Sequence, residues 1–233
     1  MIEIVRAHEH YHFQNDWLSS FWHFSFDEFY DPNKVAFGAL RVFNDDTVQP
    51  NRGFGTHSHR EMEIVTYVIS GRVAHRDSTG SQFLIQPGEA QRMSAGTGIS
   101  HSEMNPDPDE PVHFLQIWII PAEKGIEPSY EQKGFPRDQR QGVLLPIVSG
   151  QGIPGGLRIH QDTTFYVSCL NSGDSVTHHL ASAARKSYLF VIEGKIQLNG
   201  EVLQARDVAR LTAHDDLQIK ASESSELILL DLP

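Results

Sequence analysis

The sequence predicts an all-β fold made of two tandem antiparallel barrels or jelly rolls. Short runs rich in Val, Ile, Phe and Tyr are separated by clusters of Gly, Pro, Asn and Asp, a pattern typical of strands joined by turns. No segment has the length and periodicity of a long helix. A chain of 233 residues with 39% hydrophobic residues can bury one large β core or two small ones.

Two parts of the chain repeat one order of strands and turns, and this repeat predicts the tandem arrangement. The first part has strand, turn at Gly71, strand, turn at Gly80 and strand. The second part repeats this order with turns at Gly194 and at Asn199-Gly200, where Asn-Gly is a strong signal for a two-residue hairpin. We therefore interpret the chain as a tandem duplication.

The boundary between the two copies is expected near residue 135, which gives domains 1–135 and 136–233. The segment 126–154 is rich in Pro, Gly and Gln, a composition typical of a connector that crosses between two β units.

Composition and charge exclude several classes of function. The formal charge of −11 disfavours direct binding to nucleic acid, because phosphate backbones repel an acidic surface. No apolar run approaches the ~18 to 20 residues that cross a bilayer, so a membrane protein is not expected. Cys169 is the single cysteine and the N-terminal residues do not resemble a signal peptide, so we expect a cytoplasmic protein without disulfides.

Two pairs of metal-capable side chains are the main clue to function. His57-Ser58-His59 and His101-Ser102-Glu103 each place two such side chains at positions i and i+2. On a β-strand these positions project from the same face, so each pair can direct two ligand atoms into one space. Two such strands side by side would supply three imidazoles and one carboxylate, with room left for water, dioxygen or substrate.

A rival cluster of histidines at the same spacing lies near the N-terminus, in the run from His8 to His12. Such an isolated cluster is usually exposed and binds metal only by chance. The pair at His57 differs because Gly53 and Gly55 precede it, a dense apolar strand follows it, and a second ligand pair is present. We read His75, His113 and His160 as ordinary strand or loop histidines.

The stretches GFGTHSHREMEIVTYVISG and PGEAQRMSAGTGISHSEMN resemble the two cupin motifs in the form found in the pirin family. The segments FSFDEFYDP, FGALRVFNDD and LQIWIIP are also similar to bacterial pirin-like proteins, including those described as quercetin 2,3-dioxygenases. The similarity covers nearly all of residues 1–135 and weakens afterwards. It implies a bicupin in which His57, His59, His101 and Glu103 are the iron ligands of the N-terminal cupin.

Glu63 occupies the position from which ordinary cupins take their carboxylate ligand, whereas the pirin arrangement takes it from Glu103. Glu63 shares strand parity with His57 and His59, so a regular strand would direct it into the same interior. Three roles stay open: the base that accepts a proton from substrate, a hydrogen-bond acceptor that orients a ligand imidazole, or an extra ligand. We favour the first two equally.

The resemblance implies a metal-dependent dioxygenase that opens the central ring of a flavonol such as quercetin and releases carbon monoxide. The donors suit Fe(II) and tolerate Mn, Co, Ni, Cu or Zn. The alternative is a non-enzymatic iron-dependent regulator that binds a protein partner, as eukaryotic pirins are described. A cupin sugar isomerase is less favoured, because it would need a polar pocket.

The second copy, residues 136–233, is expected to be a degenerate cupin without metal, which gives one ion per chain. His178 and His179 are adjacent, so on a strand they would face opposite ways. His214 is followed by Asp215 and Asp216 but has no histidine at i+2.

Overall fold

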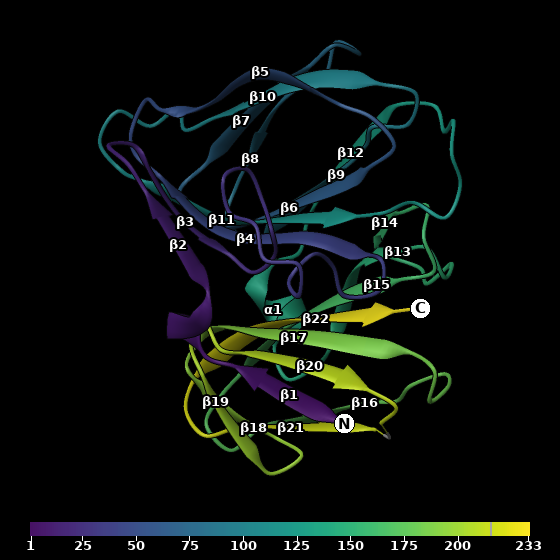
Figure 1. Ribbon diagram of the computed structural model, residues 1–233. Coiled ribbons are helices and arrows are strands. Elements are labelled where there is room, and N and C mark those ends of the chain that lie inside the picture. The colour runs from purple at the N-terminus through teal and green to yellow at the C-terminus, as the bar shows by residue number, and fades with distance from the viewer. Residues whose placement is uncertain (215) are drawn as a thin grey trace. The chain divides into compact units, whose positions relative to one another are not determined.

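The computed structural model describes residues 1–214 and 216–233 and divides into two compact units (Figure 1). Residues 11–134 and 157–161 form the first unit, called here the N-terminal barrel. Residues 1–10, 135–156 and 162–233 form the second, called the C-terminal barrel. Both units consist of antiparallel strands, so the predicted all-β bicupin fold is confirmed.

The N-terminal barrel consists of two sheets with the strand orders β12-β9-β6-β11-β4-β3-β2 and β5-β10-β7-β8 (Figure 1). A short additional strand, β14 (Leu157–Arg158), lies beside β12 and β9. The other strands are β2 (Tyr11–Gln14), β3 (Leu18–Trp22), β4 (Leu40–Val48), β5 (Gly53–His59), β6 (Glu63–Ser70), β7 (Val73–Asp77), β8 (Gln82–Ile85), β9 (Glu89–Ser94), β10 (Ile99–Met104), β11 (Val112–Ile119) and β12 (Ser129–Gly134).

The C-terminal barrel also consists of two sheets, one with the order β1-β20-β17-β22-β15-β13 and one with the order β16-β21-β18-β19. It contains two short helices, η1 (Ala7–Glu9) and α1 (Arg137–Arg140). Its strands are β1 (Ile2–Val5), β13 (Leu145–Ser149), β15 (Thr164–Leu170), β16 (Ser175–His178), β17 (Lys186–Glu193), β18 (Lys195–Leu198), β19 (Glu201–Gln204), β20 (Val208–Thr212), β21 (Leu217–Ala221) and β22 (Ser225–Leu232).

The strand orders bear out the internal repeat. The run β9-β6-β11-β4 of the first unit matches β20-β17-β22-β15 of the second, and β5-β10-β7-β8 matches β16-β21-β18-β19. The turn glycines also correspond: Gly71 and Gly194 have φ of 72° and 83°, and a Cβ on either would meet backbone oxygen within 2.7 Å. Asn199 and Gly200 both have positive φ, as the predicted two-residue hairpin requires.

The segment 126–154 is more structured than a connector. It contains β12, which belongs to the N-terminal barrel, and α1 and β13, which belong to the C-terminal barrel. Pro128, Pro136 and Pro154 lie outside these elements, whereas Pro146 lies within β13 next to a register shift, where proline is tolerated. The first residues of the chain also differ from a simple tandem order, because β1 pairs with β20 in the C-terminal barrel.

The interior of the N-terminal barrel is divided by a polar layer. One end is filled by the apolar cluster around Val68, Ile85 and Phe114, and the other by the cluster around Ile64 and Met93. The C-terminal barrel instead has one continuous aliphatic cluster of buried Leu, Ile, Val and Ala residues. None of the helices in the described part of the chain is long and apolar enough to cross a membrane.

Candidate metal centre

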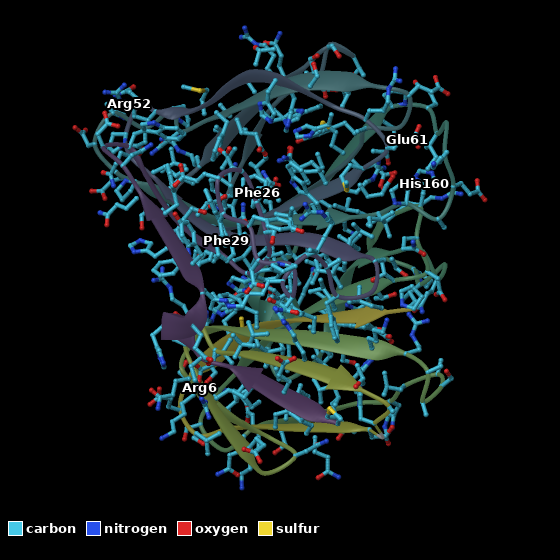
Figure 2. The ribbon with its side chains drawn as sticks, viewed as in Figure 1. Arg6, Phe26, Phe29, Arg52, Glu61 and His160 are labelled. Atoms are coloured by element: carbon cyan, nitrogen blue, oxygen red, sulfur yellow. The ribbon has the colours of Figure 1, made fainter. Side chains whose placement is uncertain are left out.

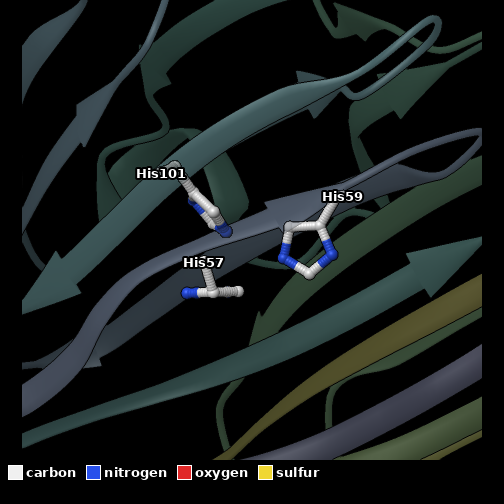
Figure 3. Close-up of side chains that lie close together, drawn as sticks. All are labelled: His57, His59 and His101. Carbon is white, nitrogen blue, oxygen red and sulfur yellow. The ribbon is translucent and has the colours of Figure 1, made fainter.

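Three histidines meet on the inner face of the β5–β10 pair (Figure 3). His101 on β10 pairs directly with His57 on β5, and His59 follows at i+2 on the same face. The ring centroids lie 4.5 Å apart for His57 and His101, 4.9 Å for His59 and His101, and 4.7 Å for His57 and His59. One nitrogen from each ring lies within 4.8 Å of the others.

The nitrogen atoms of this cluster fit a metal ion. His59 Nε2 and both ring nitrogens of His101 are buried without a hydrogen-bond partner, although a buried polar group without a partner is costly. Burial, followed by the neighbouring histidines, lowers the pKa of His59 to about 4 and that of His101 to about 3. Both imidazoles are therefore neutral at neutral pH, the form that binds a metal.

The tautomer of His57 is set by the backbone. His57 Nδ1 lies 2.8 Å from the carbonyl oxygen of Gly55, which can only accept a hydrogen bond. The proton must therefore sit on Nδ1, and Nε2 keeps its lone pair for an ion.

Glu103 lies beside His101 and is held in place by hydrogen bonds. Gln91 Nε2 donates to Glu103 Oε1 at 2.7 Å, Gln116 Nε2 donates to Oε2 at 2.6 Å, and Thr66 Oγ1 lies 2.9 Å from Oε1. A register shift between His101 and Glu103 pairs Glu103 with Phe54. The carboxylate is grouped within 4.8 Å with His101 and His75 rather than with all three histidines.

Thr66 links this carboxylate to its neighbours, because its hydroxyl also contacts Gln91 at 2.8 Å and Gln116 at 3.0 Å. We expect Thr66→Val, which keeps the shape and removes the hydroxyl, to weaken metal binding by about 10- to 100-fold, the effect typical of a lost partner of a ligand. Metal titration measures this, with Thr177→Val on an exposed strand of the C-terminal barrel as control. Equal affinity of the Thr66 and Thr177 variants would contradict the prediction.

A cavity of about 520 Å³ opens onto the histidines. Six Phe and Trp side chains line it, and one of them, Trp118, packs edge-on against His59 with ring centroids 4.8 Å apart. Polar groups from β3, β4 and β11 complete the lining. The aromatic residues are Phe13, Trp17, Trp22, Phe26, Phe54 and Trp118, and the polar residues outside the histidine cluster include Ser20, Asn44, Asp46 and Gln116.

Glu63 does not join this site, and the expectation that it faces the same interior as His57 and His59 is wrong. The chain bends between β5 and β6 at Glu61, whose φ is 52° (Figure 2). On β6, Thr66 faces the cavity side, so Glu63 faces the other side of the sheet. There its carboxylate accepts a hydrogen bond from Ser94 Oγ at 3.0 Å and lies 3.3 Å from His160 Nδ1.

Comparisons with known proteins agree with this architecture. Residues 4–119 match the family Pirin, and residues 146–232 match the quercetinase C-terminal cupin domain. The chain is 43% identical to the quercetin 2,3-dioxygenase of Escherichia coli strain K12 over 233 residues, which cover all of this chain and 99% of the relative. The chain belongs to the pirin family. The resemblance inferred from the motifs is thereby confirmed.

Two further relatives agree with the assignment to the pirin family. A pirin-like protein of Caulobacter vibrioides is 40% identical over 216 residues, 92% of each chain. The bacterial pirin YhhW of Escherichia coli, solved in complex with nickel(II), superposes with a TM-score of 0.94 at 41% identity, covering 100% of this chain and 99% of that one. In this chain, the grouped His and Glu side chains could hold a metal ion.

His75 belongs to a second group of metal-capable side chains, together with His101 and Glu103, which was not predicted from the sequence. It lies on β7, pairs with Glu103 on β10, and its buried Nε2 lies 3.0 Å from Asp77 Oδ2. Its ring is 5.4 Å from that of His101, and its Nδ1 is buried without a partner. The available signal was the His-x-Asp spacing after the turn at Gly71, which puts both side chains on one strand face.

The remaining histidines have other environments. His12 of the N-terminal run contacts Ser19 Oγ at 2.9 Å and stacks on Phe21, and His113 contacts Asp45. His178 is buried against Asp231, whereas His179 is exposed beside Asp216, so the two face opposite ways as predicted. Asp215 lies outside the described residues. Within residues 1–214 and 216–233, the grouped metal-capable side chains belong to the N-terminal barrel.

Proposed function

We propose that this pirin is a metal-dependent dioxygenase that opens the central ring of a flavonol such as quercetin. His57, His59, His101 and Glu103 hold one divalent ion per chain, and the C-terminal barrel, with its aliphatic interior, holds none. Iron(II) is the proposed ion, with Mn, Co, Ni, Cu and Zn as alternatives suited to the same donors. The names of the relatives at about 40% identity support a quercetin-type substrate, and the nickel complex of YhhW supports a metal site.

The observation that carries the proposal is the aromatic cavity that ends at unpartnered histidine nitrogens. Six aromatic side chains line about 520 Å³ of space, which suits a flat phenolic ligand better than a sugar. The same space reaches His57, His59, His101 and Glu103. A planar substrate held there would place its oxygen atoms beside the metal ligands.

The chain itself supplies binding, orientation and exclusion of water. A bound ion would supply a positive centre that takes the oxygen atoms of a chelating phenol and permits its reaction with dioxygen. Trp118 packs on His59 and so restricts the orientation of that ligand ring. Gln91 and Gln116 fix both oxygens of Glu103. The aromatic walls displace water from the substrate, which strengthens each polar contact within the cavity.

The proposal includes a small aromatic substrate and dioxygen as partners and a cytoplasmic location. The formal charge of −11 argues against nucleic acid as a partner. The other candidate function, an iron-dependent regulator that binds a protein, would use the same metal site. Catalytic turnover distinguishes the two, because only the dioxygenase would consume a flavonol.

The test is turnover with defined metals. Protein purified without an affinity tag is stripped with a chelator and reloaded with one metal at a time. Loss of flavonol absorbance, oxygen uptake and carbon monoxide release are then measured together. We expect all three to depend on the loaded protein, with each metal in buffer alone as control. If no loaded form exceeds its buffer control, the dioxygenase proposal is wrong and the regulator is favoured.

A further inference from the structure

A ring-opening reaction on a flavonol needs a group that accepts the proton of the substrate hydroxyl, and Glu63 faces away from the cavity. We propose that Asp46 is this proton acceptor. The inference rests on the proposed function, because it assigns a role within the same cavity. Three observations carry it: the position of Asp46 on β4, its burial, and the engagement of the other carboxylates of the cavity.

The position of Asp46 follows from the alternation of β4. Asn44 and Asp46, at i and i+2, both line the cavity, whereas Asp45 between them contacts His113. Asp46 pairs with Ser20 on β3 and with Phe114 on β11, so it lies within the sheet rather than at its edge. Pairing on both sides fixes the backbone of Asp46 and so the direction in which its side chain projects.

The other carboxylates that line the cavity are less suited to accept a proton. Glu103 already receives hydrogen bonds from Gln91 and Gln116 on its two oxygens and is a proposed ligand. Asp27 lies outside the strands and is exposed. Asp46 is only 2% exposed, and Ser20 Oγ donates to its Oδ1. No hydrogen bond to its Oδ2 is found among the described residues, which leaves that oxygen available to a ligand.

Burial makes Asp46 a stronger base than an ordinary carboxylate. Burial raises the pKa of Asp46 to about 8; the hydrogen bond from Ser20 opposes this, and the charges of Asp45 and Glu103 add to it. A base whose pKa lies near the working pH is the most effective acceptor. A dication held nearby would lower the pKa of Asp46 from its metal-free value and increase the ionised fraction. The other titratable groups of the cavity are His57 and His59 from β5, His101 from β10, and Asp27.

The step itself is a simple proton transfer. The O–H bond of the substrate hydroxyl breaks, an O–H bond forms on Asp46, and the electron pair stays on the substrate oxygen. No oxidant is consumed in this step. Because the ionised form of Asp46 is required, the rate should rise as the pH increases through the pKa of this residue.

The test compares Asp46→Asn with Glu63→Gln, since both remove one buried carboxylate and keep its volume. Asp46→Asn should keep its metal and lower kcat/KM by about 10²- to 10⁴-fold, the effect of a lost general base. In a profile of kcat/KM against pH, the wild type should show an acid limb, the rise in rate as Asp46 ionises, and Asp46→Asn should lose this limb. Glu63→Gln should keep most of the turnover and the limb. Wild-type turnover with an unchanged limb in Asp46→Asn would overturn the proposal.

A second variant guards against a folding defect. Ser20→Ala removes the hydrogen bond that lowers the pKa of Asp46, so the acid limb should move to higher pH while turnover persists above it. A purely structural role for Asp46 would not produce this shift. An unmoved limb in Ser20→Ala would therefore count against Asp46 as the titrating group.

Binding without oxygen separates this inference from the proposed function. Quercetin is added anaerobically to metal-loaded protein, and the visible absorption band reports whether the bound flavonol has lost its proton. A deprotonated band in the wild type and a neutral band in Asp46→Asn at the same pH would support Asp46 even if no variant turns over. The same band in both proteins, or no binding by the wild type, would overturn the inference.

Discussion

The His101→Ala variant should lose its metal and its turnover while keeping its fold. His101 belongs to both groups of metal-capable side chains, one with His57 and His59 and the other with His75 and Glu103. Loss of a direct ligand should cost more than the about 10- to 100-fold in metal affinity that follows loss of a ligand's partner. The fold should persist because separate apolar clusters pack both ends of the barrel.

Elemental analysis and thermal unfolding with and without added metal measure this result. An ion that binds only the folded state raises the unfolding temperature of the wild type, and it should not raise that of His101→Ala. His179→Ala, which removes an exposed imidazole of the C-terminal barrel, is the matched control and should respond like the wild type. Full metal occupancy of His101→Ala would show that His101 is not a metal ligand.

Gly53→Ala should lower both stability and metal affinity. A Cβ on Gly53 would lie 2.3 Å from the carbonyl oxygen of Glu103 and 2.6 Å from Cα of Met104. These are backbone atoms of β10, so the clash is relieved only if β5 moves away from β10. We expect a loss of about 1–3 kcal/mol, typical of overpacking, together with weaker metal binding because His57 and His101 separate.

Gly55→Ala is the control on the same strand, because a Cβ there meets no atom within 4 Å. Its stability should stay within about 0.5 kcal/mol of the wild type, as for ordinary surface substitutions. Urea unfolding of the metal-free proteins and metal titration distinguish the two variants. Equal behaviour of Gly53→Ala and Gly55→Ala would show that close approach of the strands does not position the ligands.

Patterns within single strands and turns were predictable from the sequence. Spacing at i and i+2 placed His57 with His59 on one face, and the Asn199-Gly200 pair was recognised as a hairpin turn. Both rest on local geometry, since alternation on a strand and positive φ at a turn depend only on neighbouring residues. The pirin motifs then identified the family over the N-terminal barrel.

The prediction for Glu63 failed because alternation applies only within one strand. The bend at Glu61 separates β5 from β6, and the side chain turns to Ser94 and His160 instead of the cavity. The positions of Asp46 and His75 beside the histidine cluster were not predictable from the sequence for a related reason. Each lies on a strand distant in sequence from the histidine pairs, and only sheet pairing brings it to the site.

The sequence by itself determined the all-β duplicated fold, the family and the strand pairs that carry the metal-capable side chains. The tertiary structure alone decided which other groups reach the cavity: it brings Asp46 and His75 to the site, turns Glu63 away, and gives Glu103 its hydrogen bonds from Gln91 and Gln116. The physical reason is that the direction of a side chain follows from local backbone geometry, whereas the neighbours it meets depend on how distant strands pair and bend.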